Sequence, residues 1–375
     1  MLHNLSSWDD YAIHQASTPV LQPVTGDPNA YDRYFFHGYD ASGMIFVVAV
    51  GVYPNRGIID ASLCVSRDGV QRSVFSSGRL GDERRTLDVG AFTLEVVEPL
   101  DRLRVRVMAP DHGLSADLTF IARTVPLLEP RQTMLDRARL VMDTCRFAQF
   151  GRWEGALTVD GEVIQIRPDD VAGTRDRSWG VRPLSGATPQ SPSPEVAGIW
   201  WLWAPLQFDD GCVHVALAED ARGVPTVRGM ALLDSLGRRT VAQAGDASVE
   251  HARDVRADVE WEPGTRRARR ARVTLDRVGG NPPLTCALEP IGRVFLRGAG
   301  YLNFEWPHGG WKDEVAVGGE VLRHADLDPG DFQSLHVQQV VKVTASDGRE
   351  GIGVLEQLCI GPHEPSGFIE FADLA

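Results

Sequence analysis

The sequence has few of the features that mark disulfide scaffolds, zinc sites or nucleic-acid interfaces. Its five cysteines are scattered and never occur in a Cys-x-x-Cys spacing, so neither a disulfide framework nor a zinc ribbon is indicated. Lysine occurs only at Lys312 and Lys342, and the formal net charge is −13. Because nucleic-acid binding depends on clustered basic charge, we expect no nucleic-acid partner. Free cysteines are typical of a reducing compartment, and we therefore expect a cytoplasmic protein.

Long apolar segments are also missing. The longest apolar run, Met44 to Tyr53, has about half of the ~20 residues that a membrane-spanning helix needs. The first ten residues are polar and lack the basic and then apolar pattern of a secretory signal. We therefore expect neither stable membrane insertion nor export.

The common catalytic and cofactor motifs are absent. The chain contains no Gly-x-Ser-x-Gly, no phosphate-binding GxxxxGK[ST], no dinucleotide-binding GxGxxG after a strand and no HExxH. Four further histidines, His251, His324, His336 and His363, show no ligand spacing with acidic residues. We therefore expect no cofactor and no metal.

What the chain does contain is a pattern of short strands and tight turns. Glycine and proline are abundant, with 38 and 23 residues, and Asp-Gly pairs occur at 68–69, 160–161 and 347–348. Such pairs supply the positive φ angles of tight hairpins. Apolar residues alternate with a period of two between residues 92 and 120, which is typical of half-buried strands. The pattern predicts an all-β protein.

Two segments interrupt this pattern. Residues 133–146 carry apolar side chains at helical spacing, which predicts a single prominent helix packed on a sheet. Residues 184–196 are rich in proline and serine and have no apolar periodicity. They predict a linker between an N-terminal β domain at 1–185 and a C-terminal β domain at 196–375.

Opposite charges are concentrated in two neighbouring runs. Residues 256–262 are largely acidic, residues 266–272 are strongly basic, and Pro263-Gly264 lies between them. One interpretation is an anion-binding patch. We favour a hairpin whose acidic and basic side chains pair across a solvated face, because the chain is negative as a whole.

The most unusual polar cluster is GTRDRSWGVRP, at Gly173–Pro183. In one interpretation Asp176 and its neighbouring arginines form a rigid hydrogen-bonded junction beside Trp179. In the other, Asp176 is a buried acid whose pKa is tuned by those arginines. We favour the junction, because an aspartate flanked by arginines tends to stay ionised and is then a poor acid near neutral pH.

Two further clusters place histidines among aromatic residues. In YLNFEWPHGGW, at Tyr301–Trp311, alternation predicts a strand that Pro307 ends, which leaves His308 and Trp311 on a loop. His308 suits a general acid or base there, and a structural histidine is equally compatible. In YFFHGYD, aromatic residues surround His37, for which we favour a hydrogen-bonded core position over a titratable group in a ligand cavity.

Together these blocks resemble a known superfamily. The order YFFHGYD, GVYPNRGIIDA, GRWEGALTVDG, GTRDRSWGVRP and GAGYLNFEWPHGGW resembles the hydroxyneurosporene synthase (carotenoid 1,2-hydratase)-like group, particularly its bacterial branch. The resemblance covers most of the chain, and its strongest element is RDRSWGVR, Arg175–Arg182. It implies two lipocalin-like (calycin) β domains in tandem, a layout also found in natural-product cyclases that include fungal Diels-Alderases. Neither a carotenoid substrate nor hydration follows, because the group is functionally diverse.

The implied fold suggests a small hydrophobic partner. A β-barrel of this kind holds an apolar ligand at its mouth or interior, and nine tryptophans and fourteen phenylalanines supply contact surface. We expect a terpenoid, steroid or polyketide-like molecule. The leading hypothesis is a cofactor-independent enzyme that hydrates, isomerises or cyclises an alkene of such a substrate by acid catalysis. The alternative is a non-catalytic carrier of a hydrophobic ligand.

The residues that this hypothesis selects come from the three clusters. The candidate acids are Asp176, His308, His37 and Glu305. The candidate substrate-binding residues are Trp179, Trp306, Trp311, Tyr301, Arg175 and Arg182. The sequence indicates neither the substrate nor the oligomeric state.

Overall fold

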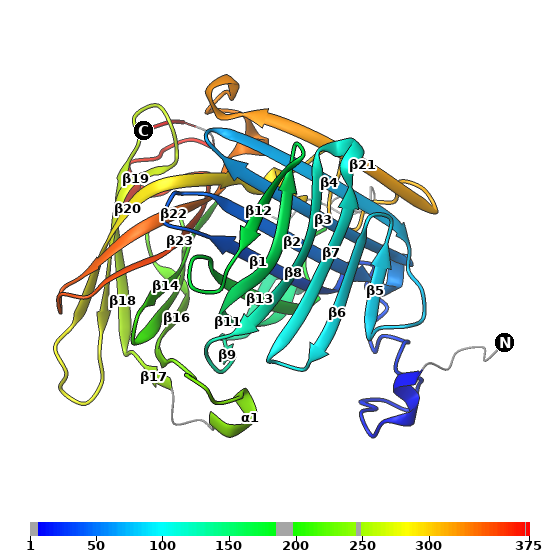
Figure 1. The fold of residues 1–375 in the computed structure, drawn as a ribbon. Coiled ribbons are helices and arrows are strands. Elements are labelled where there is room, and N and C mark those ends of the chain that lie inside the picture. Colours follow the sequence, from blue (N-terminus) through cyan, green and yellow to red (C-terminus); the bar gives the residue numbers. More distant parts are fainter. Residues whose placement is uncertain (1–6, 185–197, 245–248, 372) are drawn as a thin grey trace.

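The computed structural model describes residues 7–184, 198–244, 249–371 and 373–375. Almost all of their regular structure is β-strand, arranged in two antiparallel sheets of 14 and nine strands (Figure 1). The all-β fold class with two lipocalin-like units in tandem is therefore confirmed.

The first sheet curls round its own core. Its strands are β1 (Ala30–Tyr39), β2 (Ile45–Tyr53), β3 (Ile58–Arg67), β4 (Val70–Arg79), β5 (Thr86–Val89), β6 (Phe92–Glu98), β7 (Arg102–Ala109), β8 (Leu114–Ala122), β9 (Leu127–Leu128), β10 (Gln132–Asp136), β11 (Arg139–Val159), β12 (Glu162–Ile166), β13 (Ala172–Val181) and β21 (Val315–Arg323). The main path is β21-β4-β3-β2-β1-β13-β11-β8-β7-β6-β5, and β9, β10 and β12 pair with β11. The ends of this path approach each other, since the N–H of Ala91, next to β5, donates to Oγ of Ser76 in β4. The sheet is thus a nearly closed barrel.

The second sheet is built from the C-terminal half of the chain. Its strands are β14 (Ile199–Phe208), β15 (Gly211–Glu219), β16 (Pro225–Asp234), β17 (Val249–His251), β18 (Asp254–Trp261), β19 (Ala268–Asp276), β20 (Leu284–Phe295), β22 (His336–Ala345) and β23 (Glu350–Ile360). They pair in the order β17-β16-β15-β14-β23-β22-β20-β19-β18. The first and last strands of this half, β14 and β23, are therefore neighbours at its centre.

Helical structure is limited to single turns in the described part of the chain. The one α-helix there is α1 (Val241–Ala244). The 3₁₀ turns are η1 (Ser7–Asp10), η2 (Pro54–Arg56), η3 (Pro110–His112), η5 (Leu296–Ala299), η6 (His324–Asp326), η7 (Phe332–Ser334) and η8 (Glu364–Ser366). None of the described helices has the length and apolar character needed to cross a membrane.

One strand of the first sheet comes from the second half of the chain. After β20 the chain passes through η5 and the loop of residues 300–314 to β21, which pairs with β4 from Val315↔Gly78 to Arg323↔Val70. It then returns to the second sheet as β22. This excursion ties the two sheets together and carries Tyr301 and His308.

Large apolar side chains fill the interior of the first barrel. Phe36, Phe120 and Trp153 pack edge to face there, with ring centroids 5.4 to 5.8 Å apart. A separate cluster, which includes Phe35 and Val340, joins the outer faces of the two sheets. The polar groups described below lie in this interface between the sheets, and not inside the first barrel.

The helix predicted at residues 133–146 is not formed. These residues make β10 and the start of β11, a hairpin that reverses at Arg137, whose φ is +55°. Met134 pairs with Met142 across the hairpin, so apolar residues that fit a helical spacing lie opposite each other on two strands. β11 continues for 21 residues and pairs with β8 and β13. These non-local pairs outweigh the local helix propensity.

The predicted hairpins are confirmed. Asp-Gly turns join β3 to β4, β11 to β12 and β22 to β23. The acidic and basic runs form the hairpin β18–β19, in which Glu260 pairs with Arg270 and Asp258 with Arg272. Residues 185–196 of the predicted linker lie outside the described residues, and the domain boundary there stays a prediction.

Alanine at Gly161 is expected to lower the free energy of unfolding by roughly 1–2 kcal/mol. Gly161 has a φ of +84° in the turn between β11 and β12, and no atom lies within 4 Å of the position of an added Cβ. The cost is therefore conformational. Gly81→Ala is the matched control, because Gly81 has equally open surroundings without a left-handed φ. Urea unfolding of the two variants measures the difference, and equal midpoints would contradict this explanation.

Candidate functional site

Alternation along β1 and β13 decides which side chains face the second sheet. On β1, Phe36 lies in the core of the first barrel, whereas Phe35 lies in the cluster between the sheets. Phe35 pairs with Asp176 of β13, and directly opposite residues of an antiparallel pair share a face. Arg33, His37 and Asp176 therefore project toward the second sheet.

The arginines on either side of Asp176 project the other way. Arg175 donates from Nε to Oε1 of Gln149 at 2.9 Å, and Arg177 forms an ion pair with Asp32. Neither arginine forms an ion pair with Asp176, which has no ion-pair partner among the described residues. The predicted arginine–aspartate junction is therefore not formed, because a strand places consecutive side chains on opposite faces.

Four strands of the second sheet contribute side chains to this interface. The rings of Trp203 (β14) and His37 are 5.7 Å apart, and Oε1 of Gln338 (β22) lies 3.4 Å from Nδ1 of His37. His214 (β15) packs edge-on against Trp203. Glu356 (β23) accepts a hydrogen bond of 2.6 Å from Nε2 of Gln338. Ionisable and aromatic groups from both sheets thus meet around His37.

Glu129, between β9 and β10, is a buried carboxylate with several donors. Nε of Arg146 donates to its Oε2 at 2.8 Å, and Nε1 of Trp203 donates to its Oε1 at 3.2 Å. Nε2 of His214 lies 3.1 Å from the same Oε1. Burial alone would raise the pKa of Glu129, but the charge of Arg146 and the contacts of His214 outweigh burial and lower it to about 2.

Glu356 is a second well-satisfied carboxylate. Besides the bond from Gln338, its Oε1 accepts from Nε1 of Trp201 at 2.9 Å and lies 3.0 Å from Nε2 of His336. Burial opposes ionisation, but His336, Gln338 and the charge of Arg146 together lower the pKa of Glu356. Both glutamates are therefore ionised at neutral pH.

Asp176 is the third carboxylate of the interface and differs from the other two. It keeps partial solvent exposure, and no described residue donates a hydrogen bond to it. Burial raises its pKa to about 7; the negative charges of Glu129 and Glu356 add to this effect, and the charges of Arg146 and Arg33 oppose it. A large share of Asp176 side chains is therefore protonated near neutral pH.

His37 is fully buried and neutral. Burial lowers its pKa to about 4, although Gln338 and the charge of Glu356 favour the cation. With Nδ1 facing the Oε1 of Gln338, the neutral ring donates from Nδ1 and keeps Nε2 as an acceptor. That Nε2 has no hydrogen-bond partner among the residues that the structure describes.

The loop after η5 adds an aromatic and cationic group beside these carboxylates. The ring of Tyr301 packs edge-on against His308 and His336, with centroids 4.4 and 4.8 Å apart. The guanidinium groups of Arg33 and Arg182 lie 4.7 and 5.8 Å from the centroid of the same ring. His336 also contacts Glu356. The aromatic and cationic residues around Tyr301 are therefore connected to the buried carboxylates through His336.

Arg33 holds this loop against β1. Its Nη1 lies 2.6 Å from Nε2 of His308, and its Nη2 donates to the carbonyl oxygen of Ala299 at 3.0 Å. Burial and the positive charges of Arg33 and Arg182 lower the pKa of His308 well below its ordinary value. His308 is therefore neutral and accepts the hydrogen bond from Arg33.

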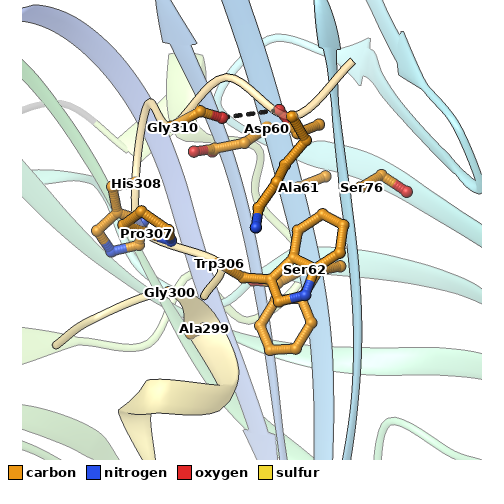
Figure 2. Close-up of a pocket in the computed structure, with 13 residues that line it drawn as sticks. Asp60, Ala61, Ser62, Ser76, Ala299, Gly300, Trp306, Pro307, His308 and Gly310 are labelled. Atoms are coloured by element: carbon orange, nitrogen blue, oxygen red, sulfur yellow. Dashed lines mark hydrogen bonds between the residues drawn. The ribbon is translucent and has the colours of Figure 1, made fainter. Parts of the chain in front are cut away.

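His308 also lines a small pocket between this loop and the strands β3 and β4 (Figure 2). Asp60 on the wall of the pocket accepts a hydrogen bond of 2.7 Å from the N–H of Gly309. Trp306 stacks on Phe75 with ring centroids 5.5 Å apart. The contacts of the pocket therefore fix the loop on the first barrel.

Five of the residues selected from the sequence meet in or beside this interface. Asp176 and His37 project from the first barrel, and Tyr301, His308 and Arg182 form the group beside them. His37 is fully buried and lies within hydrogen-bond distance of Gln338, which matches the core position favoured from the sequence.

The other selected residues lie elsewhere. Trp306 lines the small pocket, Arg175 points into the first barrel, and Trp179 and Trp311 are 39% and 48% exposed. Glu305 is exposed on the loop. The strand predicted at residues 301–306 is not formed, because bends replace it and Leu302 has a φ of +52°.

Sequence reasoning missed most of the ionisable groups of the interface. These are Glu129, Arg146, His214, His336 and Glu356. The available signal was a polar residue inside an otherwise apolar strand, as in VHVAL around His214 and VLEQL around Glu356. Such a residue needs a partner when it is buried, and the partner lies on another strand.

Solved structures of similar fold include three named proteins. A Nitrosomonas europaea protein provisionally named AttH has a TM-score of 0.55 at 14% identity and covers 88% of this chain and 92% of its own. CghA, solved with Sch210972, has a TM-score of 0.50 at 15% identity and 88% coverage of both chains. Kievitone hydratase from Nectria haematococca has a TM-score of 0.45 at 15% identity and covers 90% and 94%. At these identities the likeness concerns the fold alone, and the relationship to hydroxyneurosporene synthase stays a prediction.

Sequence comparisons give a family without an activity. No curated protein matches the chain. One family model matches residues 5–369, which is nearly the whole sequence. The chain therefore belongs to DUF8625, described as a family of unknown function.

Proposed function

We propose that this protein is a cofactor-independent enzyme that acts on an apolar small molecule by acid catalysis between its two sheets. The observation that carries the proposal is Asp176, an acid with a pKa of about 7 next to two glutamates whose pKa values are lowered. Titratable neighbours whose surroundings drive their pKa values apart are typical of acid–base sites. Asp176 is the proton donor of the proposed site, and the glutamates stay charged.

The chemistry that suits this arrangement begins with proton transfer to a carbon–carbon double bond. The O–H bond of Asp176 breaks, the proton bonds to one alkene carbon, and the neighbouring carbon becomes cationic. The negative charges of Glu129 and Glu356 stabilise this cation. The carboxylate of Asp176 then takes a proton from an adjacent carbon, which gives an isomerised alkene, or from an added water, which gives an alcohol. In a cyclisation, the π electrons of a second double bond of the substrate first attack the cation and form the ring bond, and the new cation then loses a proton to Asp176.

Access to Asp176 supports a small-molecule substrate. Asp176, Arg146 and Trp201 are partly exposed, whereas His37 and Trp203 behind them are buried. The Arg146 guanidinium lies over the indole of Trp201, 4.9 Å from its centroid. We place the apolar substrate beside this stacked pair, with one carbon near Asp176. The structure of CghA with Sch210972 lends support, because it pairs a protein of similar fold with a small molecule. We keep isoprenoid, steroid or polycyclic compounds as the proposed substrate class.

Native mass spectrometry of protein purified from its own host tests the proposal. We expect a retained apolar compound. Incubation of that compound with fresh native protein should convert it into a species of equal mass, or of a mass changed by one water, and heat-denatured protein should leave it unchanged. Recovery of the unchanged compound from native protein would contradict catalysis and favour the carrier.

Turnover is expected to fall as the pH rises through about 7. The active form is protonated Asp176, whose pKa of about 7 means that kcat/KM should fall about tenfold per pH unit above that value and level off below it. His37 titrates only near 4 and should not alter the profile around neutral pH. Initial rates on the compound identified above, measured across the pH range in which the protein stays folded, provide the profile. A rate that rises from pH 6 to pH 8 would contradict the role of Asp176 as an acid.

A further inference from the structure

We infer that the substrate carries an anionic oxygen group, such as a carboxylate, that binds Arg182 and Arg33 beside Tyr301. The inference rests on the proposed function and deepens it, because it defines one end of the molecule whose other end reaches Asp176. Arg33 lies near the start of β1, and Arg182 directly follows the last residue of β13, the antiparallel neighbour of β1. Both guanidinium groups approach the ring of Tyr301.

Each of the two guanidinium groups has an unused donor that is shielded from solvent. Nε of Arg33 and Nη2 of Arg182 have no hydrogen-bond partner among the described residues. Arg33 as a whole is only 1% exposed. Leaving a buried donor unpaired is costly, and native structures seldom keep such donors without a ligand or water to satisfy them. Two of them around one tyrosine ring indicate a place for a shared acceptor.

Arg33 and Arg182 both lie within electrostatic range of Asp60, but neither is bound directly to a described carboxylate. Arg33 donates to neutral His308 and to a backbone carbonyl, and Arg182 lies over the ring of Tyr31 at 4.5 Å. Neither arginine forms an ion pair with a carboxylate of the described residues. Asp60 accepts its hydrogen bonds from Tyr53 and Gly309 instead.

Another buried arginine, Arg266, has a hydrogen-bond acceptor for each of its guanidinium nitrogens. Arg266 is 2% exposed, and it donates to the carbonyl oxygens of Gly361, Glu370 and Asp373 and pairs with the carboxylate of Asp373. Arg266 has no orphaned nitrogen. Arg175 and Arg297 also carry one orphaned nitrogen each. The cluster around Tyr301 differs in that two such arginines lie beside one ring.

The position of the cluster relates it to the proposed acid. Arg33 pairs with Ser178, which lies on the same face of β13 as Asp176 and two residues away. Tyr301 is partly exposed, so a ligand can enter beside its ring. The planar fork of a guanidinium matches the two oxygens of a carboxylate. A molecule with its oxyanion at Arg182 and its apolar body along β13 would bring a double bond to Asp176.

Two matched fluorescent probes test the inference with the full-length protein. 1-Anilinonaphthalene-8-sulfonate and N-phenyl-1-naphthylamine share one ring system, and only the first carries an anionic oxygen group. Wild-type protein should bind the sulfonate at least tenfold more tightly than the neutral amine. Arg182→Gln should remove that preference with less than a twofold change for the neutral probe. Arg269→Gln, on the exposed hairpin β18–β19, removes the same charge elsewhere and should keep the preference.

The possible results separate this inference from the proposed function. Equal affinity of the wild type for both probes, or a preference that survives Arg182→Gln, would overturn the anion site and leave acid catalysis untouched. Failure of both probes to bind would overturn the apolar ligand site on which both proposals depend. Circular dichroism reports whether Arg182→Gln is folded. If it is not, Arg182→Lys takes its place, because lysine keeps the positive charge and lacks the planar guanidinium. This variant should show a reduced preference for the sulfonate, and an unchanged preference would overturn the inference.

Discussion

Asparagine in place of Asp176 is expected to raise the free energy of unfolding by roughly 2–4 kcal/mol at pH 8. In the folded protein the pKa of Asp176 is about 7, whereas an aspartate in the unfolded chain titrates near 3.9. Ionising Asp176 at pH 8 therefore destabilises the folded state. Asparagine has nearly the same shape and does not ionise, so the variant avoids this cost.

The difference between the two proteins should depend on pH with a definite sign. Below about pH 4 both the folded and the unfolded state hold the proton, and the stabilities should be similar. Between about pH 4 and 7 the unfolded state loses its proton first, so the wild type loses stability relative to the variant as the pH rises. Urea unfolding across this range measures the difference. Asp88→Asn, at an exposed position on β5, is the control and should show no such trend.

The same variant should also be inactive. Loss of a general acid typically costs about 10²–10⁴-fold in rate, and Asp176 is the donor in the proposed reaction. A substitution that stabilises the fold and removes activity marks a residue kept for function rather than for structure. An Asp176→Asn protein that is less stable than wild type at every pH would contradict this and match the arginine–aspartate junction expected from sequence.

Glutamine in place of Glu129 is expected to have the opposite effect and to lower the free energy of unfolding by about 3–5 kcal/mol at neutral pH. The variant leaves the Arg146 side chain, which is only 20% exposed, without its hydrogen-bonded carboxylate. The pKa of Glu129 is about 2 in the folded protein, below its value in the unfolded chain. Its contribution is therefore present above about pH 4.5 and lost as the pH falls toward 2.

Glu162→Gln provides the comparison for this second prediction. Glu162 pairs with Arg67 on the surface, where both side chains are well exposed. Surface pairs contribute about 0–1 kcal/mol, so this variant should unfold almost like wild type. Denaturant unfolding at neutral pH compares the two variants. If both variants lose a similar amount of unfolding free energy, Glu129 contributes no more to stability than a surface carboxylate does.

Local signals were enough to predict much of the fold. Asp68-Gly69 and Asp160-Gly161 adopt the positive φ angles that such pairs favour, and the strands they join follow the predicted alternation. The segment at 133–146 shows where local reasoning fails. Its apolar spacing fits a helix, but its partners are distant strands, and pairing with β13 and β8 cannot be inferred from the segment itself.

The site was harder to predict than the fold because its members are distant in sequence. Trp203 contacts Glu129 only after the two sheets have packed together. The segment RDRSWGVR was singled out as unusual, but its residues were treated as one cluster. If it had been assigned as a strand, alternation alone would have separated Asp176 from Arg175 and Arg177.

Strand β21 makes the first barrel depend on residues that the ribosome produces late. When synthesis has reached residue 184, every strand of that barrel except β21 has been synthesised, and the edge of β4 is still unpaired. Exposed N–H and C=O groups along Val70–Arg79 then form a template on which another chain can pair. The nascent protein therefore has an aggregation-prone edge until the C-terminal half supplies the missing strand, and the two sheets are completed together rather than one after the other.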